Sequence, residues 1–391
     1  MRTIIFGTYD TAMHPRIATI AEGLAARGFD VTECNIPLGL STADRVDMLA
    51  KPWKAGGLVA RLAGRWLGLA ARARRLGRPD AVVVGYLGHF DVHLARLLYP
   101  RRSRVPIVLD HLISAAGTAK DRRIGGSGMK QRLLTLIDAA ALRAADIVVV
   151  DTEEHLEIVP AKYRPKAVVV HVGAPTPWHA AARDLSATAS ATTGPSTTGP
   201  STTGGGPLKV VFYGLYTPLQ GTPVIGEALG RIADAPVEVT MIGRGQDEAE
   251  TKRAAAGNQS VRWLDWVPAA ELPALVAAHD VCLGIFGTGD KALRVVPNKV
   301  FQGAAAGCAV ITSDTAPQRR VFGPVPQESG AVLVPPGDPA GLADALLRLA
   351  NDREALLKLR HAARQLAAER FTPEQVVGPL TDRLLRPHAG A

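Results

Sequence analysis

Three cations stand close together in the last third of the sequence, in a stretch rich in glycine and small residues. Lys291, Arg294 and Lys299 follow Phe286-Gly-Thr-Gly-Asp290 and precede Ala304-Ala-Ala-Gly307. Cations beside a helix start suit a diphosphate, because charged donors and a helix N-terminus both attract phosphate oxygens. The stretch therefore predicts a diphosphate site rather than a solvated charged surface.

The same stretch predicts the helix that presents two further polar side chains. Pro297 suits the first turn of a helix. Asn298 then lies four residues before Gln302, and Lys299 three residues before it, so the three side chains share one side of the helix.

Two glycine-containing turns follow predicted strands earlier in the same half. The first spans Tyr213–Gly221 and offers Gly214, Gln220 and Gly221. The second is Gly243-Arg244-Gly245. Glycine lets backbone amides approach an anion closely, and Arg244 adds a cation. Each turn is also compatible with a plain tight connection, so neither identifies a site alone.

A third turn, Trp263–Pro268, places Val267 where a planar base could stack or meet backbone polar groups. Tryptophans next to a short apolar run are more often part of a core. We therefore interpret these two tryptophans as core residues and retain Val267 as a candidate contact.

Both halves of the chain alternate short β-branched runs with helical patterns, which predicts parallel sheets covered on both faces. Ligands of such sheets lie beyond the carboxyl ends of the strands. The expected strands are Thr3–Gly7, Val31–Cys34, Ala81–Val84, Ile107–Leu109, Ile147–Val150, Ala167–His171, Val210–Phe212, Val237–Ile242, Val261–Trp263, Val281–Ile285, Ala309–Ile311 and Val332–Val334.

A low-complexity Gly/Pro/Ser/Thr segment over residues 186–207 divides the chain nearly in half. It carries too little apolar surface to offset its ordering entropy, so we expect a linker. The expected domains are 1–185 and 208–372, with a C-terminal helix over 373–391 that can cross back to the first domain. The fold class is α/β, with two Rossmann-like doubly wound domains.

The net charge of +9 comes entirely from the first half, where 26 basic and 17 acidic residues precede Leu185. Part of the excess lies in 51–78, where Trp and Leu residues intermix with Arg. Two interpretations stay open: a basic amphipathic helix on an anionic membrane surface, or a solvated helix that packs its leucines on the core. No nucleic-acid reader motif accompanies the charge, so nucleic acid is not an expected partner.

Three scattered cysteines (Cys34, Cys282 and Cys308) argue against a disulfide framework or a Cys-rich metal site. The sequence contains no HExxH, P-loop or DxD motif, and we expect neither a metal nor another cofactor. It has no apolar run near 20 residues and enters a strand at Thr3. We therefore expect a cytoplasmic protein, with contact at the inner face of the membrane left open.

The order of these motifs resembles the group 1 (family 4) glycosyltransferases of GT-B fold. The resemblance rests on the Tyr213–Gly221 turn, "IGRGQ", "LDWVP" and "PNKVFQGAAAGCAVI", and spans most of 208–322. It implies two Rossmann-like domains facing a central cleft. It also implies retaining, metal-independent sugar transfer from a nucleotide diphosphate donor, with the donor in the second domain and the acceptor in the first.

The sequence departs from that family at two places. The family pairs two glutamates with seven residues between them; Arg294 and Gln302 occupy those positions here. The Arg and Lys usual in the first glycine turn are replaced by Leu215 and Gln220. Lys291, Arg294 and Lys299 are expected to supply the missing cations.

In the first half, Asp110 and His111 end a predicted strand and are candidate catalytic residues. A carboxylate there could orient an acceptor hydroxyl, which gives Asp110 more weight than His111. His14, Tyr86 and Asp91 follow the ends of two other strands and are candidates for the acceptor pocket. His14 is equally compatible with a plain helix start.

The resemblance favours a UDP-sugar donor, with a GDP-sugar as the other option. The acceptor stays open among lipid-linked, glycan and small-molecule classes. Two other functions also stay open: a sugar-nucleotide 2-epimerase of the same fold, and a nucleotide-sugar-binding protein without activity. A Rossmann dehydrogenase is disfavoured, because Gly7-Thr-Tyr-Asp replaces GxGxxG after the first strand.

Overall fold

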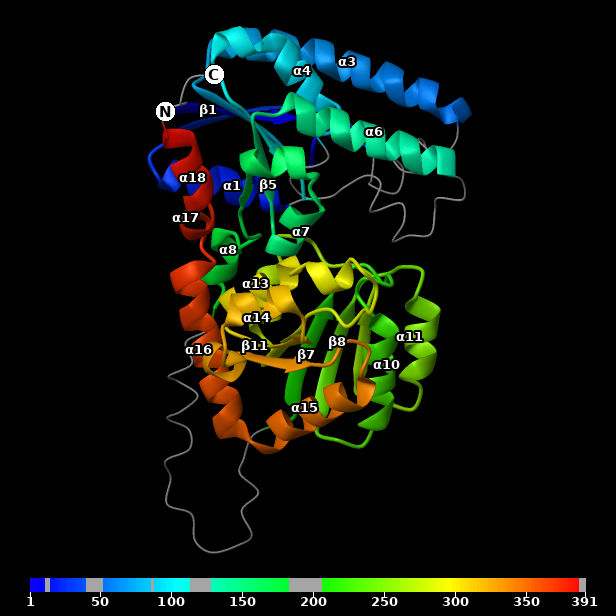
Figure 1. The fold of residues 1–391 in the computed structure, drawn as a ribbon. Coiled ribbons are helices and arrows are strands. Elements are labelled where there is room, and N and C mark those ends of the chain that lie inside the picture. Colours follow the sequence, from blue (N-terminus) through cyan, green and yellow to red (C-terminus); the bar gives the residue numbers. More distant parts are fainter. Residues whose placement is uncertain (11–14, 40–51, 86–87, 113–127, 183–205, 387–391) are drawn as a thin grey trace, which may run out of the picture. The chain divides into compact units, whose positions relative to one another are not determined.

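The computed structural model describes the chain except for residues 11–14, 40–51, 86–87, 113–127, 183–205 and 387–391. The chain forms two compact units, one of residues 1–172 with 373–391 and one of residues 173–372. Nearly all of the expected linker, 186–205, lies outside the described residues. Each unit contains one six-stranded sheet of parallel strands (Figure 1). The predicted α/β architecture is therefore confirmed.

The first sheet has the strand order β2-β1-β3-β4-β5-β6. Its strands are short and mostly β-branched, and three of them are buried along their whole length, as expected of strands covered on both faces. Their bounds are Arg2–Gly7 (β1), Asp30–Asn35 (β2), Ala81–Val84 (β3), Ile107–Asp110 (β4), Ile147–Val150 (β5) and Ala167–Val169 (β6).

Helices cover both faces of this sheet (Figure 1). On one face α3 (Pro52–Leu76), α4 (Asp91–Leu98) and α6 (Gly128–Ala144) pack on side chains such as Ile4. On the other, α1 (Pro15–Ala26), α17 (Pro373–Val376) and α18 (Gly378–Leu385) pack on Ile5. Successive strand residues point to opposite faces, so each strand contributes to both cores. The helix α7 (Glu153–Ile158) follows β5.

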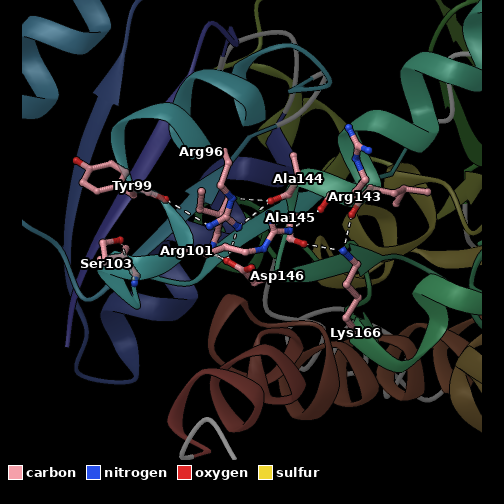
Figure 2. A network of polar contacts seen from close by, with 12 residues as sticks. Arg96, Tyr99, Arg101, Ser103, Arg143, Ala144, Ala145, Asp146 and Lys166 are labelled. Atoms are coloured by element: carbon pink, nitrogen blue, oxygen red, sulfur yellow. Dashed lines mark hydrogen bonds and ion pairs between the residues drawn. The ribbon is translucent and has the colours of Figure 1, made fainter. Parts of the chain in front are cut away.

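A network of cations closes the carboxyl end of α6 (Figure 2). The Arg96 guanidinium donates to the Ala144 carbonyl oxygen at 2.7 Å and pairs with Asp146 at 2.5 Å. Lys166 donates to the Ala145 carbonyl oxygen at 2.6 Å. The last carbonyls of a helix have no partner within it, and cations there also stabilise its dipole. The network therefore fixes α4 and η2 (Ala161–Lys166) against α6.

The second sheet has the order β12-β11-β10-β7-β8-β9. The order of strands along the chain reverses between β7 and β10, and at such a point the connections leave the sheet in opposite directions. The carboxyl ends of β7 and β10 are therefore the expected ligand position. The bounds are Leu208–Tyr213 (β7), Val237–Ile242 (β8), Val261–Leu264 (β9), Val281–Leu283 (β10), Ala309–Ser313 (β11) and Ala331–Val334 (β12).

Two groups of helices cover this second sheet. One group contacts the core formed by Leu208, Val210 and Phe212, and the other includes α13, which packs on β10 and β11. Among the described helices, none is long and apolar enough to cross a membrane. The helices are α8 (Thr176–Ala180), α10 (Thr222–Arg231), α11 (Glu248–Ala254), α12 (Leu272–Ala277), α13 (Asn298–Ala305), α14 (Ala316–Phe322), α15 (Pro339–Asn351) and α16 (Arg353–Arg370).

Candidate functional site

The loops after β7, β8 and β10 pack on each other through bare backbone at the carboxyl edge of the second sheet. A Cβ on Gly221 would lie 2.4 Å from the Gly287 nitrogen, and one on Gly243 would lie 1.9 Å from the Gly214 carbonyl oxygen. Gly221 has a φ of 63° and Gly243 a φ of 133°. Both positions therefore require glycine for close approach as well as for conformation.

This packing corrects one expectation, that the amides of Gly214–Gly221 are available to a diphosphate. The Gly214 amide donates to the Ile242 carbonyl and the Tyr216 amide to the Arg244 carbonyl. The amides of Gln220 and Gly221 both donate to the Thr217 carbonyl. The prediction does not hold for these four amides, because two of them bind the neighbouring segment and two close a turn within their own loop.

Lys299 places a buried cation beside these loops. It lies in the first turn of α13, and only 4% of the residue is exposed. Its Nζ donates to the Gln220 side-chain oxygen, lies 3.8 Å from the centre of the Phe212 ring, and would lie 3.1 Å from a Cβ on Gly214. The ring face is the negative end of its quadrupole, so Phe212 favours the charge. The predicted grouping of Gly214, Gln220 and Lys299 is thus brought together.

Burial lowers the pKa of Lys299 to about 7, and proximity to the Cys282 thiol opposes the shift only in part. No carboxylate contributes to this balance among the described residues. An ammonium without an opposite charge is costly in a low-dielectric site. An incoming anion would therefore supply the charge that this site lacks.

Gln302 lies one turn further along α13 and is also buried. Its side-chain oxygen accepts a hydrogen bond of 2.9 Å from the Tyr213 hydroxyl, and the Tyr213 ring stacks on Trp178 at 5.6 Å. The amide nitrogen, with its two N–H donors, is the group that Gln302 can offer to acceptor oxygens of a ligand. Lys299 and Gln302 share a helix side as the spacing predicted.

The remaining cations of the predicted site lie at the surface or half-buried. Lys291 directly precedes the short 3-10 helix η4 (Ala292–Arg294) and Arg294 is its last residue; both are half-buried. Asn298 begins α13 and is half-buried. Arg244 is exposed and pairs with Asp265, so a ligand would have to compete with that carboxylate.

The turn after β9 differs from its interpretation as core. Trp263 is half-buried and packs on the core, but Trp266 is 74% exposed. The prediction is wrong for Trp266, because the strand ends at Leu264 and Trp266 lies in the loop beyond it. Val267 next to it is half-buried.

Gly245, in the turn after β8, pairs with Tyr216 in a short parallel bridge.

In the first unit, Asp110 at the end of β4 forms a buried ion pair with Arg16. The Arg16 Nε lies 2.9 Å from Asp110 Oδ1, and its Nη2 donates to the Val170 carbonyl at 2.9 Å. Burial raises the pKa of Asp110, while Arg16 opposes the shift. The second carboxylate oxygen and Arg16 Nη1 have no partner among the described residues. Arg16 is a residue that sequence reasoning missed.

His111 is buried beside a second histidine. The centres of the His111 and His89 rings lie 5.4 Å apart. His89 Nε2 lies 3.0 Å from Asp138 Oδ1. Burial, together with the neighbouring His89, lowers the pKa of His111 to about 3. His111 is therefore neutral at ordinary pH, and in this form one ring nitrogen donates a hydrogen bond and the other accepts one.

Asp91 is fully occupied by contacts inside the first unit. It accepts hydrogen bonds from the Thr8 amide at 2.8 Å, the Thr8 hydroxyl at 2.9 Å and the Trp66 indole at 2.9 Å. These contacts join the end of β1 to α4 and α3, which is a structural role. The other two candidates for the acceptor pocket, His14 and Tyr86, lie outside the described residues.

The three cysteines are free and buried, in agreement with the absence of a disulfide framework. Among the described residues, no group of three or more His, Cys, Asp or Glu side chains is arranged to hold a metal ion.

Residues 207–352 match the family model described as glycosyl transferases group 1. Phosphatidyl-myo-inositol mannosyltransferase of Mycobacterium leprae is 32% identical over 159 residues. That match covers 39% of this chain and 40% of the relative's length. The second unit therefore contains a group 1 glycosyltransferase domain, and the resemblance found in the sequence is confirmed.

Solved structures resemble almost the whole chain at low identity. Sucrose-phosphate synthase from Thermosynechococcus elongatus has a TM-score of 0.68 at 15% identity and covers 98% of both chains. Anabaena HepE in complex with UDP has a TM-score of 0.63 at 11% identity, also over 98% of both. An α,α-trehalose-phosphate synthase from Burkholderia vietnamiensis reaches 0.61 at 15%, over 98% of this chain and 96% of that one. Likeness at this identity shows the fold, which is that of GT-B glycosyltransferases.

Proposed function

With a group 1 glycosyltransferase domain in residues 207–352, we propose that this chain transfers a sugar from a nucleotide diphosphate donor to an acceptor. The observation that carries the proposal is Lys299, a buried cation at the point where the strand order reverses. Within the described part of the chain, its side-chain hydrogen bond goes to Gln220, which carries no charge. A leaving diphosphate would supply the opposite charge, and this electrostatic role is the expected main term in catalysis.

We favour a UDP-sugar as donor, with a GDP-sugar as the other option. HepE, one of the structurally similar proteins, was crystallised with UDP and with UDP-glucose. In the proposal, Lys291 and Arg294 supplement Lys299 at the diphosphate, and Asn298, Gln302 and Val267 contact the rest of the nucleotide. Retention of configuration and independence of metal rest on the family resemblance.

The acceptor belongs to the first unit in this proposal, near Asp110 and His111. Its class is open among lipid-linked, glycan and small-molecule acceptors. Peripheral contact of the basic first unit with an anionic membrane is part of the same proposal.

Thermal unfolding of the full chain with UDP, GDP, ADP, TDP and NAD tests the donor site. A ligand at about a hundred times its dissociation constant adds roughly 2.7 kcal/mol, which raises the midpoint by several degrees. A shift with one nucleoside diphosphate and none with NAD would support the proposal. No shift with any diphosphate would reject it.

Turnover of an Arg294→Ala variant tests the proposed cation. Removing a charge that stabilises the leaving diphosphate should lower kcat at least tenfold. Arg348→Ala, an exposed arginine on α15, is the matched control with the same loss of charge. An unchanged rate in Arg294→Ala would remove that residue from the mechanism. Chelation by EDTA should leave the wild-type rate unchanged if no metal participates.

A further inference from the structure

One surface of the first unit combines exposed leucines with arginines. Leu67 on α3 is 76% exposed and Leu97 on α4 is 78% exposed, the two largest values among the exposed apolar residues in the described part of the chain. Both helices lie on the same face of the first sheet and contact each other (Figure 1). The exposure of Leu67 runs against the interpretation that this helix packs its leucines on the core, whereas Leu69 beside it is fully buried as that interpretation requires.

These leucines border a groove of about 1090 Å³ between α3 and α4. Trp66 and Leu94 also line it, together with Arg74 and Arg78. An open apolar surface of this kind, rimmed by charge, is typical of an interaction site. It is wide enough to receive hydrocarbon rather than a single side chain.

The charge of this surface has one sign. Residues 61–78 contain six arginines and no Asp or Glu, and residues 92–104 contain four arginines and no Asp or Glu. The first set is Arg61, Arg65, Arg72, Arg74, Arg75 and Arg78; the second is Arg96, Arg101, Arg102 and Arg104. The partner must therefore be anionic over an extended area.

Three arginines hold this surface in shape by donating to backbone carbonyls, and two of them are labelled in Figure 2. Arg96 is bound at the end of α6, and Arg101 donates to the Arg143 carbonyl at 2.9 Å. Arg78 donates to the Ser103 carbonyl at 2.5 Å, which links the end of α3 to η1 (Arg101–Ser103). The remaining arginines stand on a preformed scaffold.

Two other partners fit this surface less well. A second copy of the same face would bring two sets of arginines together without any carboxylate, and like charges repel. A nucleic acid would match the charge, but its phosphates would leave Leu67 and Leu97 without an apolar environment. A bilayer offers anionic headgroups and hydrocarbon at adjacent depths.

We propose that the surface formed by α3, α4 and η1, which we name the α3–α4 surface, docks on an anionic lipid bilayer. Leu67 and Leu97 enter the boundary between headgroups and acyl chains, and Arg74, Arg75 and Arg102 contact lipid phosphates. The proposal specifies the membrane contact included in the proposed function, but it does not depend on the donor chemistry.

Flotation of the full chain with lipid vesicles tests the proposal. Vesicles of phosphatidylcholine alone are compared with vesicles that contain 30 mol% phosphatidylglycerol, at low salt and near physiological salt. Arg74→Glu/Arg75→Glu reverses two charges, and Leu67→Ser/Leu97→Ser removes the apolar contacts. Arg253→Glu/Arg262→Glu, two exposed arginines of the second unit, is the matched control. The UDP-induced thermal shift of each variant shows whether the donor site and the fold remain intact.

The wild type should float with the anionic vesicles and not with phosphatidylcholine alone, and salt should weaken the binding. The Arg74/Arg75 variant should bind the anionic vesicles at least tenfold more weakly, the leucine variant should also bind more weakly, and the control should bind like the wild type. Absence of wild-type flotation, equal binding to both vesicle types, or equal loss in the control would overturn the proposal. So would stronger retention by a duplex DNA than by the anionic vesicles. Because the thermal shift is read separately, failure here leaves the proposed function standing.

Discussion

Replacement of Lys299 by Met tests the claim that this cation is buried without an opposite charge. Methionine has a similar length and no charge, so it fills the same space beside Phe212. The folded chain holds the pKa of Lys299 near 7, whereas an unfolded chain restores the model-peptide value near 10.5. A difference of about 3.5 in pKa corresponds to roughly 5 kcal/mol of destabilisation when the folded lysine is fully protonated.

The sign of the pH dependence follows from the lowered pKa. Above pH 7 the folded protein has released this proton while the unfolded chain still binds it, so stability rises with pH by up to about 1.4 kcal/mol per pH unit. Between pH 7 and 8.5 the gain is about 1.5 kcal/mol. The buried Cys282 and Cys308, whose pKa values are raised, act in the opposite direction at higher pH, which sets the upper end of the window.

Urea unfolding of the full chain at several pH values from 7 to 8.5 measures this gain. The difference in unfolding free energy between Lys299→Met and the wild type should shrink by about 1.5 kcal/mol across the window. Lys209→Met, at an exposed position of β7, should keep the pH dependence of the wild type. A constant difference between Lys299→Met and the wild type would refute the account of Lys299 as a buried amine without a carboxylate.

Three further predictions concern the loops and the first unit. Gly243→Ala should lower the unfolding free energy by at least about 2 kcal/mol and abolish the UDP-induced thermal shift. Gly257→Ala, at a residue with φ 98° and open space around it, should cost only about 1 kcal/mol. Equal thermal midpoints of the two variants would contradict this. Asp110→Asn leaves Arg16 buried without its counter-charge and should cost about 3–5 kcal/mol in chemical unfolding, so a loss below 1 kcal/mol would exclude a strong pair. Because the pKa of His111 is about 3, the unfolding free energy should fall by about 1.5 kcal/mol as the pH is lowered from 6.5 to 5. His111→Gln should remove that loss, and a variant that loses as much stability as the wild type over this range would contradict the prediction.

The sequence was sufficient for the sheets because their strands are continuous β-branched runs. Ala81–Val84, Ile147–Val150 and Val237–Ile242 begin and end as the pattern predicts. His171 was placed in a strand, but β6 ends at Val169. Local periodicity does not reveal where the neighbouring strand stops pairing, and this decides a strand's end.

The sequence predicts which residues of the candidate site share a helix, but not which of them are buried or what they contact. The stretch 286–307 indicated that Lys299 and Gln302 share a side of a helix, which the structure shows. That Lys299 is buried and meets Gln220 depends on how the loops pack, because the two residues are 79 positions apart. The partners of the Gly214 and Tyr216 amides could not be assigned from sequence either, since their acceptors, Ile242 and Arg244, lie at the end of another strand and in the loop after it.

In the first unit, long-range contacts decide the roles of the polar residues. Asp91 follows a strand, which suggests the acceptor pocket, yet its partners are Thr8, directly after β1, and Trp66 of α3. The sequence carries one signal for Arg16: it lies four residues before Ile20 and eight before Leu24, so it shares the apolar face of a helix, where an arginine needs a buried partner. That partner is Asp110, 94 residues away.

Analysis of the products formed from a UDP-sugar tests the central claim most directly. The full chain is incubated with UDP-sugars and a mixture of lipid, glycan and small-molecule acceptors, and nucleotide and sugar products are separated by chromatography. If the chain transfers sugar, UDP and a glycosylated acceptor should form together, and the rates at which both form should be at least tenfold lower in Arg294→Ala. Release of UDP with a free 2-epimer and no acceptor would instead identify an epimerase. Binding of UDP without any turnover of the panel would contradict the proposed transfer.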